Sequence, residues 1–348
     1  MIYRYCYRLL ITAALVGLIA APCAPAQNQP SVDPQFELVP SASGFTVAHA
    51  KESFSTLSLE DSELKPQPVL EGGKDVTPDF ERELIRVQWR PGDPIDLYVI
   101  RPKGAKNPPV VLYLYSFPSE NDRFRDNRYC ERLVKNGVAA VGFVSALTGP
   151  RIRGNRPMKQ WFISELQESL VTTTHDVQLI LNYLETRGDL DMTRVGMFGQ
   201  GSGGTIAIMA AVADPRLKAL DLLNPWGDWP DWLAKSPLVP KAEQANFLQP
   251  DFLKRVEPLD PVLLLPTLKS RAVRIQIVDA EADATTGSTG KILAAAPASA
   301  KIAHFPDGHA MYAVSSDGRL FEWLPSVLKP PTETKEAVAK TPSAITAR

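Results

Sequence analysis

The stretch that decides the fold reads R-V-G-M-F-G-Q-G-S-G-G-T from Arg194 to Thr205, and the helical pattern I-A-I-M-A-A-V-A follows it at once. The first half is a short apolar run typical of a buried strand, and the second half turns through glycines. The stretch therefore predicts a strand, a sharp turn and a helix. Such a turn lifts one side chain above the C-terminal edge of a sheet, and backbone amides at the helix start can bind an oxyanion.

The chain on both sides of this turn alternates between strand and helix patterns. Two short runs joined by P-G-D predict a strand pair, and the continuous apolar runs that follow are typical of strands buried on both faces. Strands that alternate with helices indicate an α/β fold with a doubly wound, mainly parallel sheet. The expected strands cover 84–90, 95–102, 110–115, 138–144, 218–223, 272–278 and 299–305, and the expected helices cover 129–134, 163–184 and 320–328.

The first 26 residues have the pattern of a secretory signal. Arg4 and Arg8 precede an apolar run over 9–21, and A-P-A at 24–26 has the form of a cleavage site. A membrane anchor is the alternative, but the apolar run is shorter than the ~20 residues that a spanning helix needs. We therefore expect a periplasmic or secreted protein with no stable membrane anchor after cleavage.

The exported chain divides into an arm, a domain and a tail. Residues 27–77 are rich in Pro, Ser and Glu and predict an extended N-terminal arm laid over the domain, without an assigned role. Residues 78–328 predict the domain, and about 226–268 within it predict a cap insertion of short helical pieces. Residues 329–348 show no periodicity and predict a disordered tail.

Charge and cysteine content exclude several classes of protein. The 38 Lys and Arg nearly balance the 39 Asp and Glu, so nothing indicates a nucleic acid or an anionic surface as partner. Once a signal ending at residue 26 is removed, Cys130 is the remaining cysteine, which leaves no intramolecular disulfide. The four histidines form no metal-binding pattern, so we expect neither a metal nor another cofactor.

The glycine-rich turn resembles the nucleophile elbow, G-x-S-x-G, of the α/β-hydrolase superfamily, which includes esterases and dienelactone hydrolases. Laid on that pattern without a gap, Gly199 and Gly203 are the flanking glycines, so Gly201 takes the nucleophile position. The resemblance implies an α/β-hydrolase fold over about residues 80 to 328.

A register shifted by one residue gives the alternative elbow. Ser202 then becomes the nucleophile and Gly204 the second flanking glycine, but Gln200 takes a position that favours almost no side chain. The two registers imply different functions, because only the shifted one places a hydroxyl at the turn.

The resemblance also implies an acid and a base. The loop V-D-A-E-A-D after strand 272–278 places Asp283 where the superfamily carries the acid of its triad, and F-P-D-G-H after the last strand places His309 where it carries the general base. Ser202, Asp283 and His309 follow the chain order of the superfamily. The alternatives are an ordinary loop carboxylate and a structural histidine, and His304 within the last strand is the weaker candidate base.

The oxyanion hole is expected at the end of strand 110–115. The superfamily commonly has H-G there, and Tyr115-Ser116 stands in its place, so the backbone amide of Phe117 would be the first donor. The second amide comes from Ser202 in the ungapped register or from Gly203 in the shifted one. Ser116 is either a displaced hydroxyl near the site or a residue that caps the turn.

Two further groups could contact a substrate. Trp226, Trp229 and Trp232 recur every third residue, so they either pack the cap onto the sheet or line an apolar or ring-shaped pocket; Trp226 and Trp229 are the candidate substrate-binding residues. A basic loop with Arg151, Arg153 and Arg156 could bind an acidic substrate group, although a solvated loop is the alternative, because exposed charges are the default.

Two functions follow from these residues. In the first, the protein is an exported serine hydrolase acting on a small-molecule ester: Ser202 attacks the carbonyl, His309 takes and returns the proton, and Asp283 orients His309. In the second, Gly201 stands at the turn and the protein is an inactive homologue that binds a ligand or a partner. Glycine tolerates the strained backbone of such a turn, so it would keep the turn without the nucleophile. The sequence-based prediction is hydrolysis that depends on Ser202.

Overall fold

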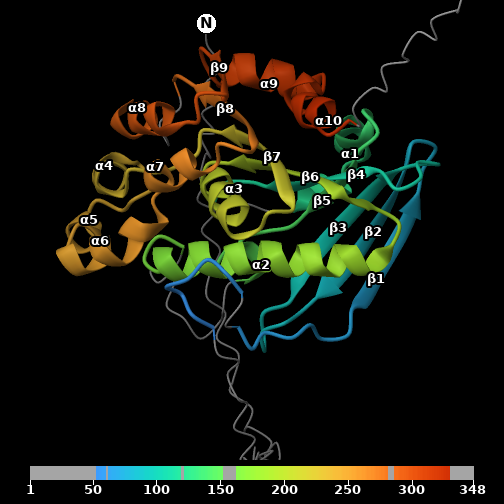
Figure 1. Cartoon of the computed structure of the whole chain (residues 1–348), viewed down its shortest axis with the longest axis horizontal. Coiled ribbons are helices and arrows are strands. Elements are labelled where there is room, and N and C mark those ends of the chain that lie inside the picture. The colour runs from blue at the N-terminus through green and yellow to red at the C-terminus, as the bar shows by residue number, and fades with distance from the viewer. Residues whose placement is uncertain (1–51, 60–61, 119–120, 152–161, 281–285, 330–348) are drawn as a thin grey trace, which may run out of the picture. The chain divides into compact units, whose positions relative to one another are not determined.

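A nine-stranded sheet forms the centre of the part of the chain that the computed structural model describes, residues 52–59, 62–118, 121–151, 162–280 and 286–329 (Figure 1). These residues all belong to one unit, Ala48–Arg348, and the second unit, Met1–Val47, lies outside them. The strands are β1 (Leu70–Val76), β2 (Phe80–Val87), β3 (Ile95–Pro102), β4 (Pro109–Leu114), β5 (Ala139–Gly142), β6 (Asp191–Gln200), β7 (Leu217–Leu223), β8 (Ala272–Val278) and β9 (Lys301–Phe305).

The strand order is β1-β2-β3-β5-β4-β6-β7-β8-β9. The pairs from β5 through β4 to β9 are parallel, and β1, β2, β3 and β5 pair antiparallel. The predicted doubly wound, mainly parallel sheet is therefore confirmed. Because β4 lies between β5 and β6, the strand order reverses there, and ligands of such sheets bind outside the carboxyl ends of the strands at that point.

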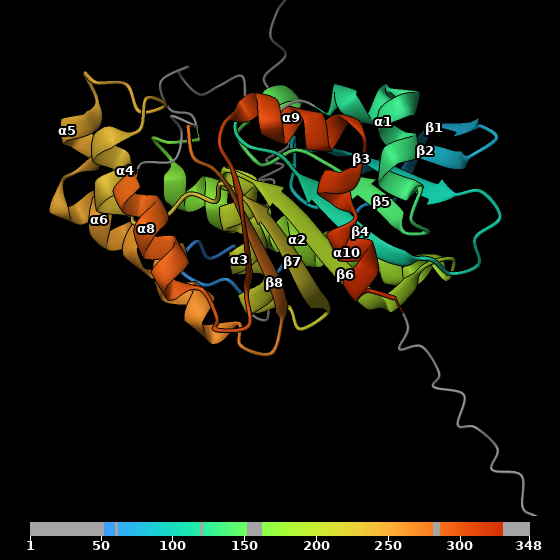
Figure 2. The same cartoon turned by 90° about the horizontal axis from the view of Figure 1, so that it is seen from above.

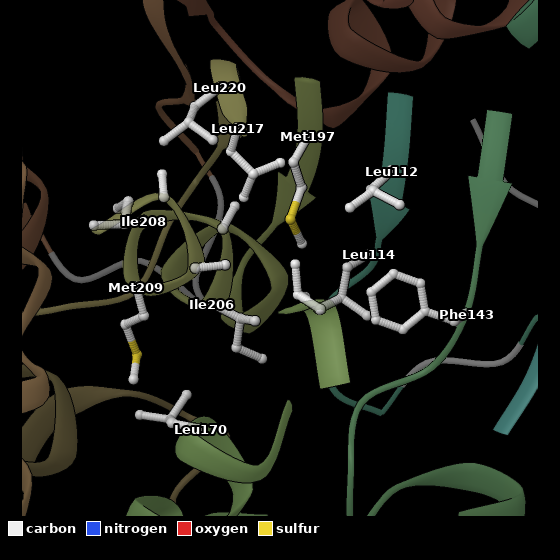
Figure 3. Close-up of a cluster of buried hydrophobic side chains, with 14 of the residues drawn as sticks. Leu112, Leu114, Phe143, Leu170, Met197, Ile206, Ile208, Met209, Leu217 and Leu220 are labelled. Atoms are coloured by element: carbon white, nitrogen blue, oxygen red, sulfur yellow. The ribbon is translucent and has the colours of Figure 1, made fainter. Parts of the chain in front are cut away.

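Helices cover both faces of the sheet (Figure 2). The helices α1 (Asn127–Val134), α9 (Gly308–Ser316) and α10 (Trp323–Val327) lie on one side, and α2 (Leu166–Arg187) and α3 (Ser202–Ala213) lie on the other. Each side has its own buried apolar cluster. The helix α3 is apolar all round because the sheet and α2 cover it on opposite sides. Figure 3 shows three of its residues, Ile206, Ile208 and Met209, among side chains of β4, β6, β7 and α2.

Short helices fill the chain between β7 and β8. They are α4 (Trp229–Lys235), α5 (Gln244–Phe247), α6 (Pro250–Val256), η3 (Glu257–Leu259), α7 (Pro261–Leu264) and η4 (Leu265–Thr267), and α8 (Thr286–Ala295) contacts α4 and α7. This group is called the cap below. Proline stands at the first or second position of α4, α6 and α7, where its missing amide proton costs nothing.

Three elements of five residues or more were not predicted from the sequence. The strand β1 lies within the stretch expected to be an extended arm, and all its residues are exposed. It forms because it pairs with the free edge of β2. The helix α9 begins directly at the loop predicted to carry the base, where the Asp307 side chain accepts a hydrogen bond from the Ala310 amide at 2.8 Å. The helix α8 is the third. The predicted signal and tail lie outside the described residues.

A buried charge network joins α2 to the β2–β3 turn. Asp176 on α2 is fully buried, and its Oδ2 lies 2.8 Å from Nη1 of Arg151, while Arg90 pairs with its Oδ1. Arg151 also binds both carboxylate oxygens of Asp93, at 2.8 and 3.0 Å. Burial alone would raise the pKa of Asp176, but the charges of Arg151 and Arg90 outweigh it and hold that pKa below its usual value. For Arg151, the expectation of a solvated or substrate-binding side chain is therefore wrong, whereas Arg153 and Arg156 lie outside the described residues.

The arm residue Glu52 extends this network. Its carboxylate accepts from Arg90 at 2.5 and 2.6 Å and lies 2.7 Å from Nδ1 of His175, whose Nε2 lies 2.9 Å from the Thr56 carbonyl oxygen. Burial would raise the pKa of Glu52, but hydrogen bonds from Arg90 and His175 lower it overall. The chain around Glu52 is thus tied to α2 by charge.

Two further observations bear on function. Cys130 on α1 is buried, its thiol donates to the Phe124 carbonyl at 3.2 Å, and burial raises its pKa to about 11. Within the described ranges, every helix is too short or too polar to cross a bilayer.

Candidate functional site

Gly201 is the apex of the turn between β6 and α3. The strand ends at Gln200 and the helix begins at Ser202, and Gly201 between them has φ 53° and ψ −119°. These angles are those of the first central residue of a type II′ turn, where glycine is the usual residue. The structure therefore has the ungapped register. The placement of Ser202 at the apex is corrected, because that residue is the first residue of the helix.

Close contacts between backbone segments fix this register. A Cβ atom built on Gly199 would lie 2.5 Å from the carbonyl carbon of Gly203, and a Cβ built on Gly203 would lie 2.7 Å from the carbonyl carbon of Leu114. Both distances are shorter than real Cβ contacts, so these two positions require glycine. Gly203 thus acts in the packing of α3 against β4 and β6, whereas the shifted register made its amide an oxyanion donor.

The hydroxyl of Ser202 accepts a hydrogen bond from the Phe117 amide, which was predicted to bind an oxyanion. Ser202 is fully buried, and its Oγ accepts a hydrogen bond from the backbone N–H of Phe117 at 2.9 Å. A bound oxyanion would lie at the same distance from such a donor. Phe117 therefore stands where the sequence places it, but its amide is already used by a side chain of the protein.

The space directly above Gly201 is filled by Ser116 and bordered by Trp226. A Cβ atom on Gly201 would overlap Oγ of Ser116 and lie 2.8 Å from its Cβ and 3.0 Å from Nε1 of Trp226. Ser116 is half-buried and its hydroxyl donates to the Phe117 carbonyl at 3.2 Å. Trp226 is 1% exposed, and its indole N–H has no acceptor among the described residues.

The parallel strands bring these residues together. Leu114 of β4 pairs with Gly199 of β6, so the residues that follow the two strands meet at the same edge of the sheet. The next strand, β7, is joined to the turn by a 2.9 Å hydrogen bond from the Gly201 amide to the Leu223 carbonyl. The Trp226 carbonyl accepts from Oγ1 of Thr205 at 2.7 Å, which holds the segment after β7 against α3.

The structure does not bring the predicted acid and base together within the described residues. Asp283 lies outside those residues, so its contact with His309 stays a prediction. His309 is in the first turn of α9, where it is exposed and its imidazole forms no hydrogen bond with another described residue. A different carboxylate–histidine contact lies at the ends of β8 and β9: Oδ1 of Asp279 is 2.9 Å from Nδ1 of His304, and both side chains are about half exposed.

The candidate tryptophans lie in different places. Trp226 borders the apex, whereas Trp229 lines a pocket of the cap. Trp232 lies between them, stacked on Trp226 with 4.5 Å between ring centroids and edge-on to Trp229 at 6.0 Å. All three are buried. Among the described residues, no group of three or more His, Cys, Asp or Glu side chains could hold a metal ion.

Comparisons with known proteins support the fold. The chain matches no protein-family model and no curated protein sequence. Among solved structures, it is similar to an acetyl xylan esterase from Paenibacillus sp. R4, with a TM-score of 0.60 and 15% identity over 74% of this chain and 88% of that one. An S-formylglutathione hydrolase from Agrobacterium tumefaciens gives 0.56 and 14% identity over 74% and 99%.

The class of fold follows from these observations together. A mainly parallel sheet, a strand–turn–helix at the end of β6 and the likeness to these enzymes show that the chain has the α/β-hydrolase fold. Identities of 14% and 15% show the fold alone. The activity therefore has to be argued from the residues at the apex.

Proposed function

We propose that this protein binds, without cleaving it, a small molecule that presents an ester carbonyl or carboxylate oxygen at the C-terminal edge of the sheet beside Gly201. The observation that carries the proposal is the apex itself. Gly201 has no side chain, and Ser116 fills the space that a side chain would need. Without a hydroxyl at the apex, no acyl-enzyme forms there.

The groups around the apex suit an oxygen acceptor. Trp226 holds a buried N–H without a partner, and a buried donor left unpaired costs about 1–3 kcal/mol. A ligand oxygen that accepts from this N–H removes that cost. Ser116 offers a second donor, because its hydroxyl can leave the Phe117 carbonyl and turn to the ligand. Indole N–H and hydroxyl donors together favour a carbonyl or carboxylate oxygen.

Hydrolysis through Ser116 is the second candidate function. Its Oγ overlaps the space of a side chain at Gly201, so a hydroxyl is present close to the usual position of the nucleophile. In this reaction His309 would take the Ser116 proton while Oγ bonds to the ester carbonyl carbon, and His309 would return the proton to the departing alcohol. Water would then cleave the acyl-enzyme. Hydrolysis through Ser202 ranks lower, because its hydroxyl is buried and bound to the Phe117 amide.

Labelling with a fluorophosphonate probe, mapped to the modified residue, separates these possibilities. We expect no labelled serine. A label on Ser116 would establish the second candidate, and a label on Ser202 would establish the hydrolase predicted from the sequence. N-terminal sequencing of the exported protein tests its location, since we propose that the mature chain begins at Gln27 and works in the periplasm or outside the cell.

Ligand-observed NMR with acetate and ethyl acetate tests the binding. Both probes should bind the full chain, and no ethanol should be released. Trp226→Phe should weaken binding by about fivefold to tenfold, the value of one hydrogen bond. Trp323→Phe is the matched control, because Trp323 also has a buried, unpartnered N–H but lies on α10. Equal affinity in both variants would overturn the proposal.

A further inference from the structure

The cap contains a pocket of about 440 Å³ that is separate from the apex. Its walls come from the start of α4 and from α6, η3, α7 and α8. Apolar side chains, among them Leu253, Val262 and Leu263, form much of its surface, and Asp228, Asp260 and Lys291 add charge. Its volume is in the range of pockets that bind small molecules.

Asp260 organises the pocket, and its carboxylate is largely occupied by backbone donors. Its Oδ1 accepts from the amides of Asp228 and Val262 at 2.9 and 3.0 Å, and its Oδ2 accepts from the Trp229 amide at 3.0 Å. These three bonds hold the starts of α4 and α7 together. The carboxylate is thus a structural group at the base of the cap.

Asp228 is different, because one of its oxygens is unused. Its Oδ1 accepts from the Lys291 ammonium at 2.8 Å, whereas its Oδ2 is buried and accepts nothing from the described residues. The residue is 7% exposed and has a left-handed backbone, with φ 52°. Such conformations in residues other than glycine cluster at ligand-binding positions.

Trp229, the next residue, supplies the complementary group. It also lines the pocket, it is 1% exposed, and its indole N–H finds no acceptor in the described chain. Two adjacent residues of the pocket wall therefore carry one unpaired acceptor, on Asp228, and one unpaired donor, on Trp229; both atoms are buried, so a ligand reaches them when these side chains turn toward the pocket. Buried polar groups are normally paired, so two orphans on adjacent residues indicate a missing partner.

We infer that this pocket binds a neutral molecule with a hydroxyl group on an apolar body, of the class of phenols and related alcohols. A hydroxyl both donates and accepts, so one group can donate to Oδ2 of Asp228 and accept from Nε1 of Trp229. The apolar body lies against Leu253, Val262 and Leu263. An amine fits less well, since Lys291 already neutralises Asp228.

Titration of the full chain with phenol, followed by ligand-observed NMR or calorimetry, tests this inference. Wild-type protein should show saturable binding at one site. Asp228→Asn should weaken phenol binding at least about tenfold. In this variant the amide oxygen still accepts from Lys291, so the NH₂ group faces the phenol hydroxyl and cannot accept its hydrogen bond. Asparagine tolerates the left-handed backbone, so the variant should fold.

A second variant and two controls show whether a loss of phenol binding comes from this pocket, from misfolding or from the apex. Leu263→Trp adds bulk at an exposed position in the pocket wall and should also weaken phenol binding. Asp251→Asn, on the exposed side of α6, and Trp226→Phe, at the apex, should leave it unchanged. No saturable binding by wild-type protein, or equal affinity in Asp228→Asn, would overturn the inference.

Discussion

Ser116 occupies the space into which a side chain at Gly201 would project. The hydrolase pattern has glycine where Ser116 stands and serine where Gly201 stands, so the small and the hydroxyl-bearing residue are interchanged across neighbouring strand ends. The turn keeps its shape because glycine adopts its backbone angles without strain. The interchange removes the nucleophile from the apex and leaves a hydroxyl beside it.

Gly201→Ser should destabilise the protein. A residue with a side chain at φ 53° costs roughly 1–3 kcal/mol, and the new Cβ meets Ser116 as well. Denaturant unfolding of the purified variant measures the loss of free energy of unfolding. Unchanged stability would show that Gly201 is not at the strained apex.

The double variant Gly201→Ser/Ser116→Gly should recover part of that loss. Removing the Ser116 side chain frees the space, so the two substitutions should couple by about 0.5–3 kcal/mol in a double-mutant cycle. The backbone strain remains, and the variant should stay less stable than wild type. Strictly additive effects of the two substitutions would contradict the contact.

Ser202→Ala should destabilise the protein. The change removes the hydroxyl that accepts from the half-buried Phe117 amide, and losing such an acceptor costs up to about 1–3 kcal/mol. Ser326→Ala, where an exposed hydroxyl donates to the Trp323 carbonyl, is the control and should change stability by less than about 0.5 kcal/mol. Unfolding curves of both variants check this. Equal effects would show that the Ser202 hydrogen bond contributes nothing special.

Arg151→Met should be among the most destabilising substitutions in the chain. It removes the cation that binds both oxygens of Asp93 and Oδ2 of Asp176, so that Arg90 alone faces the two buried carboxylates, and breaking a buried ion pair in this way costs about 3–5 kcal/mol. Arg128→Met removes an exposed arginine from α1 and should cost less than about 0.5 kcal/mol. Thermal or denaturant unfolding distinguishes the two.

Acid should weaken the network around Asp176. Its pKa and that of Glu52 are lowered in the folded protein, so both carboxylates contribute stability above the unfolded values near about 4, and that stability is lost as pH falls further. Asp221 has the opposite sign, because burial raises its pKa despite Arg274, so its contribution falls as pH rises through this region. The unfolding free energy of wild-type protein should be measured at several pH values between about 3 and 6. Compared with wild type, its rise with pH should be less steep in Asp176→Asn and steeper in Asp221→Asn.

Much of the fold could be predicted from the sequence, because buried strands are continuous apolar runs. The run at 272–278 coincides with β8, and the helical period over 163–184 matches most of α2. The strand β1 was missed because its sequence, L-E-G-G-K-D-V, has no apolar alternation and forms through pairing with β2. Edge pairing of this kind is a tertiary effect that no local pattern records.

The sequence predicted the turn at the candidate site but did not decide between its two registers. Both registers place a glycine or a serine at the turn, and contacts of Gly199 with Gly203 and of Gly203 with Leu114 decide between them. These contacts depend on how closely β4 approaches α3, which is a property of the packed sheet. The burial of Arg151 was hidden in the same way, since its partners Asp93 and Asp176 are remote in sequence.

The thiol of Cys130 can report on local opening of the fold. Its pKa of about 11 keeps almost no thiolate at neutral pH, whereas an unfolded cysteine near about 8.5 carries roughly two to three powers of ten more. A chain that begins at Gln27 has no other cysteine. The rate at which a thiol reagent modifies it therefore records how often α1 leaves the sheet, and the same measurement ranks every variant above without a denaturant.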